Sequence, residues 1–167
     1  MKRIASFVAV VTAAALLCLS LAACGEKPAD VDMYDLYKAM SGASDKWQEM
    51  KYVSSDDPDP ATIFENVSKM DYSKVNAFFI YYAAKGEGNA DEVVVIQVRQ
   101  RVDQDEAAAS LTAHLEKRKS LYATYDRSQL TRLEGARIVT KDGLAALIVA
   151  DDADRVENAF YAYLSRK

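Results

Sequence analysis

Few side chains in this sequence are suited to metal or nucleophile chemistry. His114 is the single histidine, and the two cysteines are Cys18 and Cys24. A zinc site made of histidine and cysteine needs about four such ligands, so the sequence excludes it, together with a His-Glu-x-x-His zinc hydrolase. Two acidic clusters could in principle hold a hard cation: Asp56, Asp57 and Asp59, and Asp151, Asp152 and Asp154. Neither has the spacing of a calcium-binding loop, and we expect both to cap helices and carry surface charge. We predict no metal site and no cofactor.

Nucleophilic catalysis has no recognisable motif here, because the sequence lacks a Gly-x-Ser-x-Gly elbow. His114 could in principle act as a base, but Arg118, one helical turn away, disfavours a charged imidazole. We expect His114 to be an ordinary histidine on a helix surface. A carboxylate pair of the glycosidase kind stays open, since any two of the 25 acidic side chains could converge in space. We predict no catalytic residues and no enzyme, with a carboxylate-based hydrolase of the cell envelope as the alternative.

Signatures of phosphate and nucleic-acid binding are also missing. Gly86 and Gly88 form a lone Gly-x-Gly that no helix follows, and there is no Walker lysine motif. The net charge is −4, and residues 117–119 form a short basic cluster that we expect on a solvated helix face. We therefore predict no nucleic-acid partner.

Arg118 is the residue whose type and position most suggest binding. It falls in the gap of an apolar helical stripe that comprises Ala108, Leu111, Leu115, Tyr122 and Tyr125. A charged group at such a position must pair with a carboxylate, cap carbonyl groups or meet an anionic ligand, because burying it unpaired is costly. Arg118, Tyr122 and Tyr125 are thus the candidate ligand or ion-pair residues. Some of the ten tyrosines could also line a groove for peptide or sugar.

The first 23 residues have the parts of a secretory signal. Lys2 and Arg3 are followed by an uncharged, largely apolar run over 4–20, which ends in small residues before Cys24. The sequence Leu-Ala-Ala-Cys at 21–24 resembles the lipobox of bacterial lipoproteins. This resemblance implies cleavage between Ala23 and Cys24 and attachment of a diacylglyceryl group to the Cys24 thiol. The alternative is an uncleaved membrane helix over 4–23, which has about the 20 residues that a span requires.

Cleavage at this point would change the chemistry of the chain. It removes Lys2, Arg3 and Cys18, so the net charge goes from −4 to −6 and Cys24 becomes the only cysteine. Since its thiol would carry lipid, no disulfide could form. Two acyl chains anchor a protein stably, which makes membrane lipid the predicted partner. The tether over 25–30 is short, so we expect the domain close to the extracytoplasmic side of the cell membrane.

Hydrophobic periodicity and turn residues predict helices that alternate with hairpins. A first helix should begin after Asp30 and end at Gly42, and a second should have Asp59 as its N-cap before Pro60. The remaining expected elements are an ambiguous stretch at 46–53, a hairpin of 76–84 with 92–99, a long helix over 104–125, a polar connector at 126–135, a hairpin of 137–140 with 144–150, and a last helix capped by Asp151 or Asp152.

These elements indicate an α+β fold. We predict a two-layer sandwich, in which a mainly antiparallel sheet of about four strands has its helices packed on one face. Two strand-strand-helix units follow the N-terminal helices, and their sequences leave open whether they are a true repeat. The apolar runs at 76–84 and 92–99 should occupy the sheet centre. The expected organisation is a signal peptide over 1–23, a lipidated cysteine and tether over 24–30, and a single domain over 31–167.

Several segments resemble an uncharacterised family of bacterial lipoproteins, domain of unknown function 4358. They are the run at 90–98, the helix with Arg118, Tyr125 before a polar connector, and the strand at 143–150 with its acidic cap and Phe160. The resemblance covers about residues 30–165. Leu144 departs from it, because an aromatic residue is expected there. The family implies fold and location but no established activity.

Together these features predict a membrane-anchored lipoprotein of the cell envelope with a non-catalytic binding or accessory domain. An envelope protein, a peptide or a sugar could be its partner. Besides the hydrolase, a second alternative is a small solute-binding accessory protein of a transporter. The short chain disfavours this alternative, because a two-lobed receptor needs more residues.

Overall fold

In the computed structural model, residues 27–84 and 89–166 are described, and their centre is a single antiparallel sheet. Its five strands lie in the order β1-β2-β3-β5-β4. They comprise β1 (Met50–Ser54), β2 (Val75–Ala83), β3 (Glu92–Val98), β4 (Arg137–Lys141) and β5 (Leu144–Val149). The α+β class and the antiparallel sheet are confirmed, with five strands in place of about four. The additional strand is β1, which overlaps the ambiguous stretch of the sequence and extends one residue beyond it.

Both predicted hairpins are present, and β3 occupies the middle of the sheet. Ile80 of β2 pairs with Val94 of β3, and Val94 pairs on its other side with Leu147 of β5. Every residue of β3 and β5 is buried. Near-continuous apolar strands of this kind require cover on both faces of the sheet.

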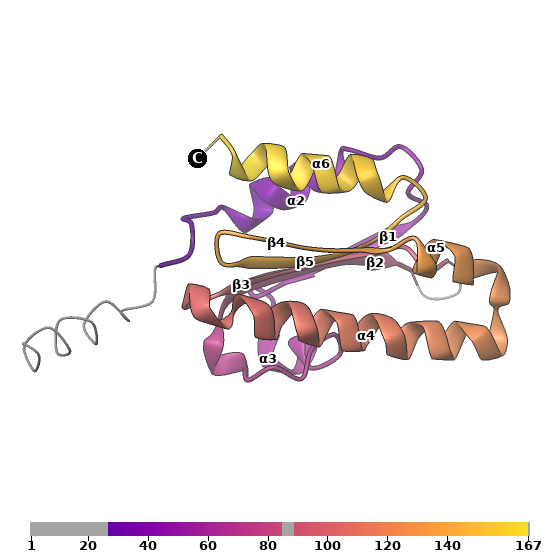
Figure 1. Ribbon diagram of the computed structural model, residues 1–167, viewed down its shortest axis with the longest axis horizontal. Helices are drawn as coiled ribbons and strands as arrows, with labels where there is room; N and C mark the ends of the chain where they lie inside the picture. Colours follow the sequence, from indigo (N-terminus) through magenta and orange to yellow (C-terminus); the bar gives the residue numbers. More distant parts are fainter. Residues whose placement is uncertain (1–26, 85–88, 167) are drawn as a thin grey trace, which may run out of the picture.

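Helices accordingly cover both faces, so the molecule has three layers and the prediction of helices on one face is wrong (Figure 1). On one face, α4 (Gln104–Tyr125) and α3 (Pro60–Phe64) pack against the sheet through Leu111, Leu115 and Phe64. On the other face, α2 (Met33–Ser41) and α6 (Ala153–Leu164) do so through Leu36 and Phe160. Successive strand residues alternate between the two cores, as the two-residue period of a strand requires.

The helix ends show where local sequence rules hold and where they fail. Asp32, not Asp30, caps α2, because its carboxylate accepts a hydrogen bond from the Asp35 amide at 2.9 Å. Asp59 precedes Pro60 as expected, but it has a left-handed backbone (φ 55°) and its side chain makes no capping bond. Asp152 stands before α6, also without a side-chain capping bond. The Asp152 carboxylate lies 3.6 Å from Arg155 Nη1 in an ion pair instead.

The long helix α4 has the predicted bounds but a slightly different buried side. Ala107, Leu111, Leu115 and Tyr122 are buried, whereas Ala108 is half-buried and Tyr125 is 60% exposed. The expected polar connector contains the short helices η4 (Arg127–Gln129) and α5 (Leu130–Glu134), because Leu133 is drawn fully into the core. Two further 3-10 turns, η2 (Tyr72–Lys74) and η3 (Arg101–Asp103), precede β2 and α4.

Residues ahead of α2 are held against the sheet. The Ala29 amide donates to the Asp142 carbonyl at 2.9 Å, and Gln97 Nε2 donates to the Ala29 carbonyl at 2.8 Å. Two of the six residues predicted as a tether, Pro28 and Ala29, therefore belong to the folded body. Within the described ranges, no helix is both long and apolar enough to span a bilayer.

Candidate functional site

A buried carboxylate at the start of β3 organises the most distinctive polar group in the molecule. Glu92 Oε2 lies 2.9 Å from His114 Nε2 and 2.9 Å from Arg118 Nη1. The three side chains are 8%, 12% and 15% exposed, so the group is nearly withdrawn from solvent. His114 and Arg118 are one turn apart on α4, which puts both on the side of the helix that faces the sheet.

Two neighbours keep Glu92 ionised in spite of its burial. Desolvation by itself would raise the pKa of this carboxyl group, but the hydrogen bond from His114 and the charge of Arg118 outweigh it and lower the pKa. Glu92 and Arg118 therefore form a buried ion pair. Because His114 bonds to the carboxylate through Nε2, its second ring nitrogen, Nδ1, is the one available for other contacts.

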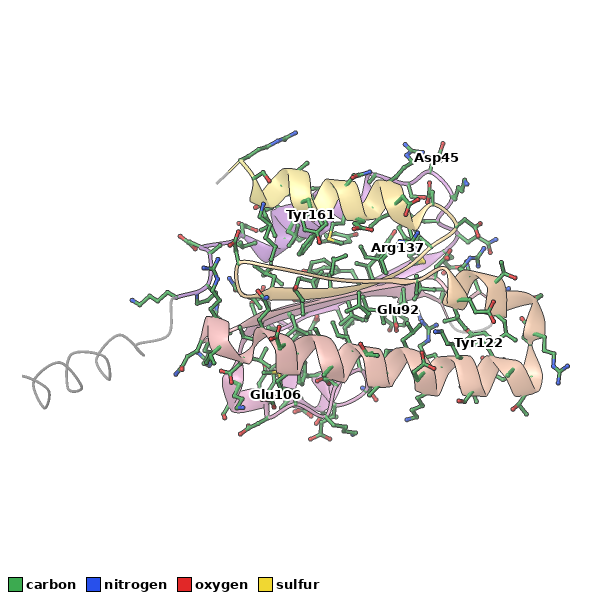
Figure 2. All side chains as sticks on the ribbon, viewed as in Figure 1. Asp45, Glu92, Glu106, Tyr122, Arg137 and Tyr161 are labelled. Carbon is green, nitrogen blue, oxygen red and sulfur yellow. The ribbon has the colours of Figure 1, made fainter. Side chains whose placement is uncertain are left out.

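Arg118, Tyr122 and Tyr125 form a row of neighbouring side chains along α4. The Arg118 guanidinium carbon lies 5.6 Å from the Tyr122 ring centroid, a cation–π distance. The buried Tyr122 hydroxyl donates to the Asn89 carbonyl at 3.2 Å, and the Tyr122 ring lies 5.0 Å from that of Tyr125. Figure 2 shows Glu92 between the sheet and α4, with Tyr122 farther along the same helix. The structure thus joins Arg118, Tyr122 and Tyr125 in one row that runs from the interior to the surface.

An apolar hollow adjoins the ion pair. It has a volume of about 320 Å³ and lies between α4, α3 with the residues that follow it, and strands β1 and β2. Val53, Ile63 and Ile80 contribute apolar wall, while Glu92 and His114 contribute polar groups. Apolar walls with a few convergent polar groups are typical of small-molecule sites, and this volume is at the lower end of their range of about 300–1,000 Å³.

A second hollow of about 430 Å³ lies beside the first, along the first half of α4. Asn66, Val67 and His114 line both hollows, so His114 stands at their junction. Ser110 also lines the second hollow, one turn ahead of His114. Its hydroxyl is within 2.5 Å of the Ser68 hydroxyl and accepts a hydrogen bond from the Lys69 amide at 3.3 Å. These bonds tie the Ser110 side chain to the chain that follows α3, and not to the His114 imidazole.

A second polar cluster surrounds Arg132 at the end of the sheet where β3 begins. Arg132 pairs with Asp151 at 2.9 Å, and its Nε lies 3.2 Å from the buried Asp91 Oδ1 without hydrogen-bond geometry. Burial raises the pKa of Asp91, although the hydrogen bond from Asn89 and the charge of Arg132 oppose this shift. These contacts fasten α5 to the start of β3 and the chain after β5, which indicates a structural role.

Four carboxylates of the two acidic clusters contact other protein groups. Asp57 accepts a hydrogen bond from the Ser54 amide at 2.7 Å. Asp151, Asp152 and Asp154 pair with Arg132, Arg155 and Arg137, respectively. The described part of the chain contains no group of three or more acidic, histidine or cysteine side chains arranged to hold a metal ion.

Glu92 and His114 are the site residues that sequence reasoning missed. His114 was expected on the helix surface, but it is largely buried against the Glu92 carboxylate. The available signal was a single acidic residue at the head of the apolar run 92–98, at a position where β3 is covered on both faces. The other predicted residues, Ala23 and Cys24, lie outside the described residues.

Comparison with known proteins identifies one family. No curated protein and no solved structure matches the chain. The sequence model of the family described as Domain of unknown function (DUF4358) matches residues 55–150, which is more than half of the chain. This range includes the Glu92 ion pair, the row along α4 and, apart from Val53, the residues that line both hollows. The chain therefore belongs to the DUF4358 family.

Proposed function

We propose that this protein is a lipid-anchored binding protein of the cell envelope, held by acylated Cys24 on the extracytoplasmic side of the membrane. The observation that carries the binding role is the apolar hollow of about 320 Å³ against the buried Glu92–His114–Arg118 group. The Leu-Ala-Ala-Cys sequence at 21–24 supports the anchor. We propose no catalysis by this site.

The polar groups suggest the chemistry of the ligand. Glu92 and Arg118 neutralise each other's charge, so a charged ligand would leave an uncompensated buried charge. Both hydrogen bonds from α4 reach Oε2 of Glu92, and a ligand donor entering from the hollow could approach Oε1. The apolar walls complement an alkyl or aromatic group. An uncharged molecule with an amide or hydroxyl donor, such as a peptide or sugar fragment, meets these conditions.

His114 is a built-in reporter for this proposal, because a lone histidine has unique ring signals in NMR spectra. Acetylated amides of glycine, leucine and phenylalanine, together with simple methyl glycosides, are suitable probes. We expect at least one probe to shift the His114 signals saturably and to bind several-fold more weakly to Glu92→Gln. The control variant is Glu157→Gln, which alters a carboxylate on α6 at the opposite face. Probes that leave His114 unperturbed, or that bind Glu92→Gln equally well, would contradict the proposal.

The alternative hydrolase would use the same carboxylate–imidazole pair as a general base, which is the observation in its favour. The hydrogen bonds of the Ser110 hydroxyl to Ser68 and Lys69 support binding over nucleophilic catalysis at this site. The same NMR titration separates the two functions. Time-dependent appearance of hydrolysed probe with the unaltered chain, and its loss in Glu92→Gln, would replace the binding role by an enzymatic one.

The anchor is tested by Cys24→Ser. We expect this variant to lose incorporation of labelled fatty acid and to leave the membrane fraction, because serine cannot form the thioether to diacylglycerol. A useful control is Cys18→Ser, whose cysteine lies in the segment to be removed and should have no effect. Unchanged acyl labelling of Cys24→Ser would show that the lipid, if any, is attached elsewhere.

A further inference from the structure

The chain enters the folded body at a defined point, the turn between β4 and β5. Pro28 packs against Gly143, where a built Cβ atom would lie only 2.4 Å from the Pro28 Cβ. The Ala29 amide and carbonyl bond to Asp142 and to the buried Gln97 side chain, respectively. We call residues 28–29 the strap. Its two hydrogen bonds and its close packing fix the exit of the N-terminal chain to one end of the sheet.

Very little chain separates the strap from the proposed lipid. Four Cα–Cα steps join Cys24 to Pro28, so the two can be at most about 14 Å apart. The 22-residue helix α4 is longer, at about 33 Å, and it begins at the strap end and runs to the opposite end (Figure 1). A lipid on Cys24 would therefore keep the strap end within about 14 Å of the membrane, while the opposite end can lie much farther away.

The surface at the strap end has side chains that suit a phospholipid headgroup layer. Arg99 donates to the Ser73 carbonyl at 3.0 Å, and Lys141 donates to the Ser165 hydroxyl at 2.8 Å, so the partners of both cations are neutral. Val102, in η3, is 74% exposed. Its neighbour Arg101 pairs with Asp142 of the β4–β5 turn, which places η3 beside the strap. Cations next to an exposed apolar side chain are typical of groups at a membrane interface.

We infer that the strap end of the domain, with Arg99, Val102 and Lys141, lies against the phospholipid headgroups of the membrane that holds Cys24. This inference rests on the proposed lipid anchor and adds the orientation of the domain. Its consequence follows from β3, which runs from Glu92 at the far end to Val98 beside the strap-end turn. The seven residues of this strand span about 20 Å, so Glu92 and its hollow are raised from the membrane toward the envelope space.

Photo-cross-linking to lipid tests this orientation on the full chain in the membranes of a bacterial host. A benzophenone amino acid replaces Val102 in one variant and Leu121, which is 55% exposed near the other end of α4, in a matched control. We expect several-fold more lipid adduct from position 102 than from position 121. Insertion of a Gly/Ser segment of about 20 residues after Lys27, with a mean reach of about 25 Å, should bring the two yields close together.

Labelled fatty acid incorporated in the same samples separates the two proposals. An acylated chain with equal yields at the two positions, or with more adduct at 121, overturns the orientation and leaves the anchor intact. A chain without acyl label overturns the anchor, and the orientation with it. Arg99→Glu combined with Lys141→Glu should lower the yield at position 102 several-fold, and an unchanged yield would remove these two cations from the interface.

Discussion

At the scale of single residues, the buried Glu92 carboxylate is the centre of an ion pair with Arg118. Its carboxylate accepts hydrogen bonds from His114 and Arg118, and these two groups compensate for the loss of hydration. An ionised side chain at this depth is stable only while its partners remain in place. The variants that follow use this dependence.

Arg118→Met should be strongly destabilising because it leaves the Glu92 carboxylate with His114 as its remaining partner. Removing one member of a buried ion pair typically costs about 3–5 kcal/mol, and we expect a loss near 3 kcal/mol in urea unfolding. The control is Lys119→Met, the next residue on α4, which breaks the more exposed Lys119–Glu116 pair. That change should cost about 0.5 kcal/mol or less. Equal effects of the two substitutions would show that the buried pair contributes little.

The change in the free energy of unfolding at acid pH should also depend on Glu92. Its folded pKa is lowered, so its contribution is complete above the unfolded pKa of about 4.3 and is lost as pH falls through the folded pKa. The stability difference between the unaltered chain and Glu92→Gln should therefore shrink as the pH decreases below about 4.

Asp91, the residue before Glu92, has a pKa shift in the opposite direction. Burial raises its pKa, so the cost of its ionisation disappears as pH falls through the folded value. Relative to Asp91→Asn, the unaltered chain should gain stability as the pH falls from this raised folded pKa to the unfolded value of about 3.9. Urea unfolding at a series of pH values measures both differences. The opposed pKa shifts would be contradicted if, as the pH falls, the stability of the unaltered chain changed in the same direction relative to Glu92→Gln and to Asp91→Asn.

At the scale of elements, much of the secondary structure follows from local sequence. The bounds of α4 and the two hairpins were predicted because helical periodicity, glycine-containing turns and apolar runs are local signals. The placement of helices on both faces was missed, although the apolar runs of β3 and β5 already required it. The site was harder to predict, because Glu92 is 22 residues from His114 and 26 from Arg118, and only the packing of α4 on β3 joins them.

The β4–β5 turn couples a local backbone requirement to the strap. Asp142 and Gly143 have φ values of 53° and 86°, and the Gly143 Cα faces Pro28. Gly143→Ala should therefore cost about 1–3 kcal/mol through backbone strain and displace the strap. Hydrogen exchange at the Ala29 amide should become faster, since its bond to Asp142 is lost. Gly135→Ala is the control, because that glycine has φ −77° and meets only the Thr131 and Arg132 carbonyls, at 3.3 and 3.6 Å. Protection of Ala29 that survives Gly143→Ala would contradict the packing of the strap.

At the scale of the whole molecule, the two ends of the sheet have different roles in our proposals. The strap end receives the N-terminal chain and would face the lipid, while the end at which β3 begins carries Glu92, the row along α4 and the first hollow. The short tether that we propose between Cys24 and the strap would make this division meaningful, because it would limit the turning of the domain at the membrane. The proposed role of the strap end depends on the chemistry of Cys24.

The most direct test is the mass of the N-terminal peptide of the protein isolated from the membranes of a bacterial host. Our account predicts a peptide that begins at Cys24 and carries the mass of a diacylglyceryl group on that residue. A peptide that begins at Met1, or one with an unmodified Cys24, would contradict it.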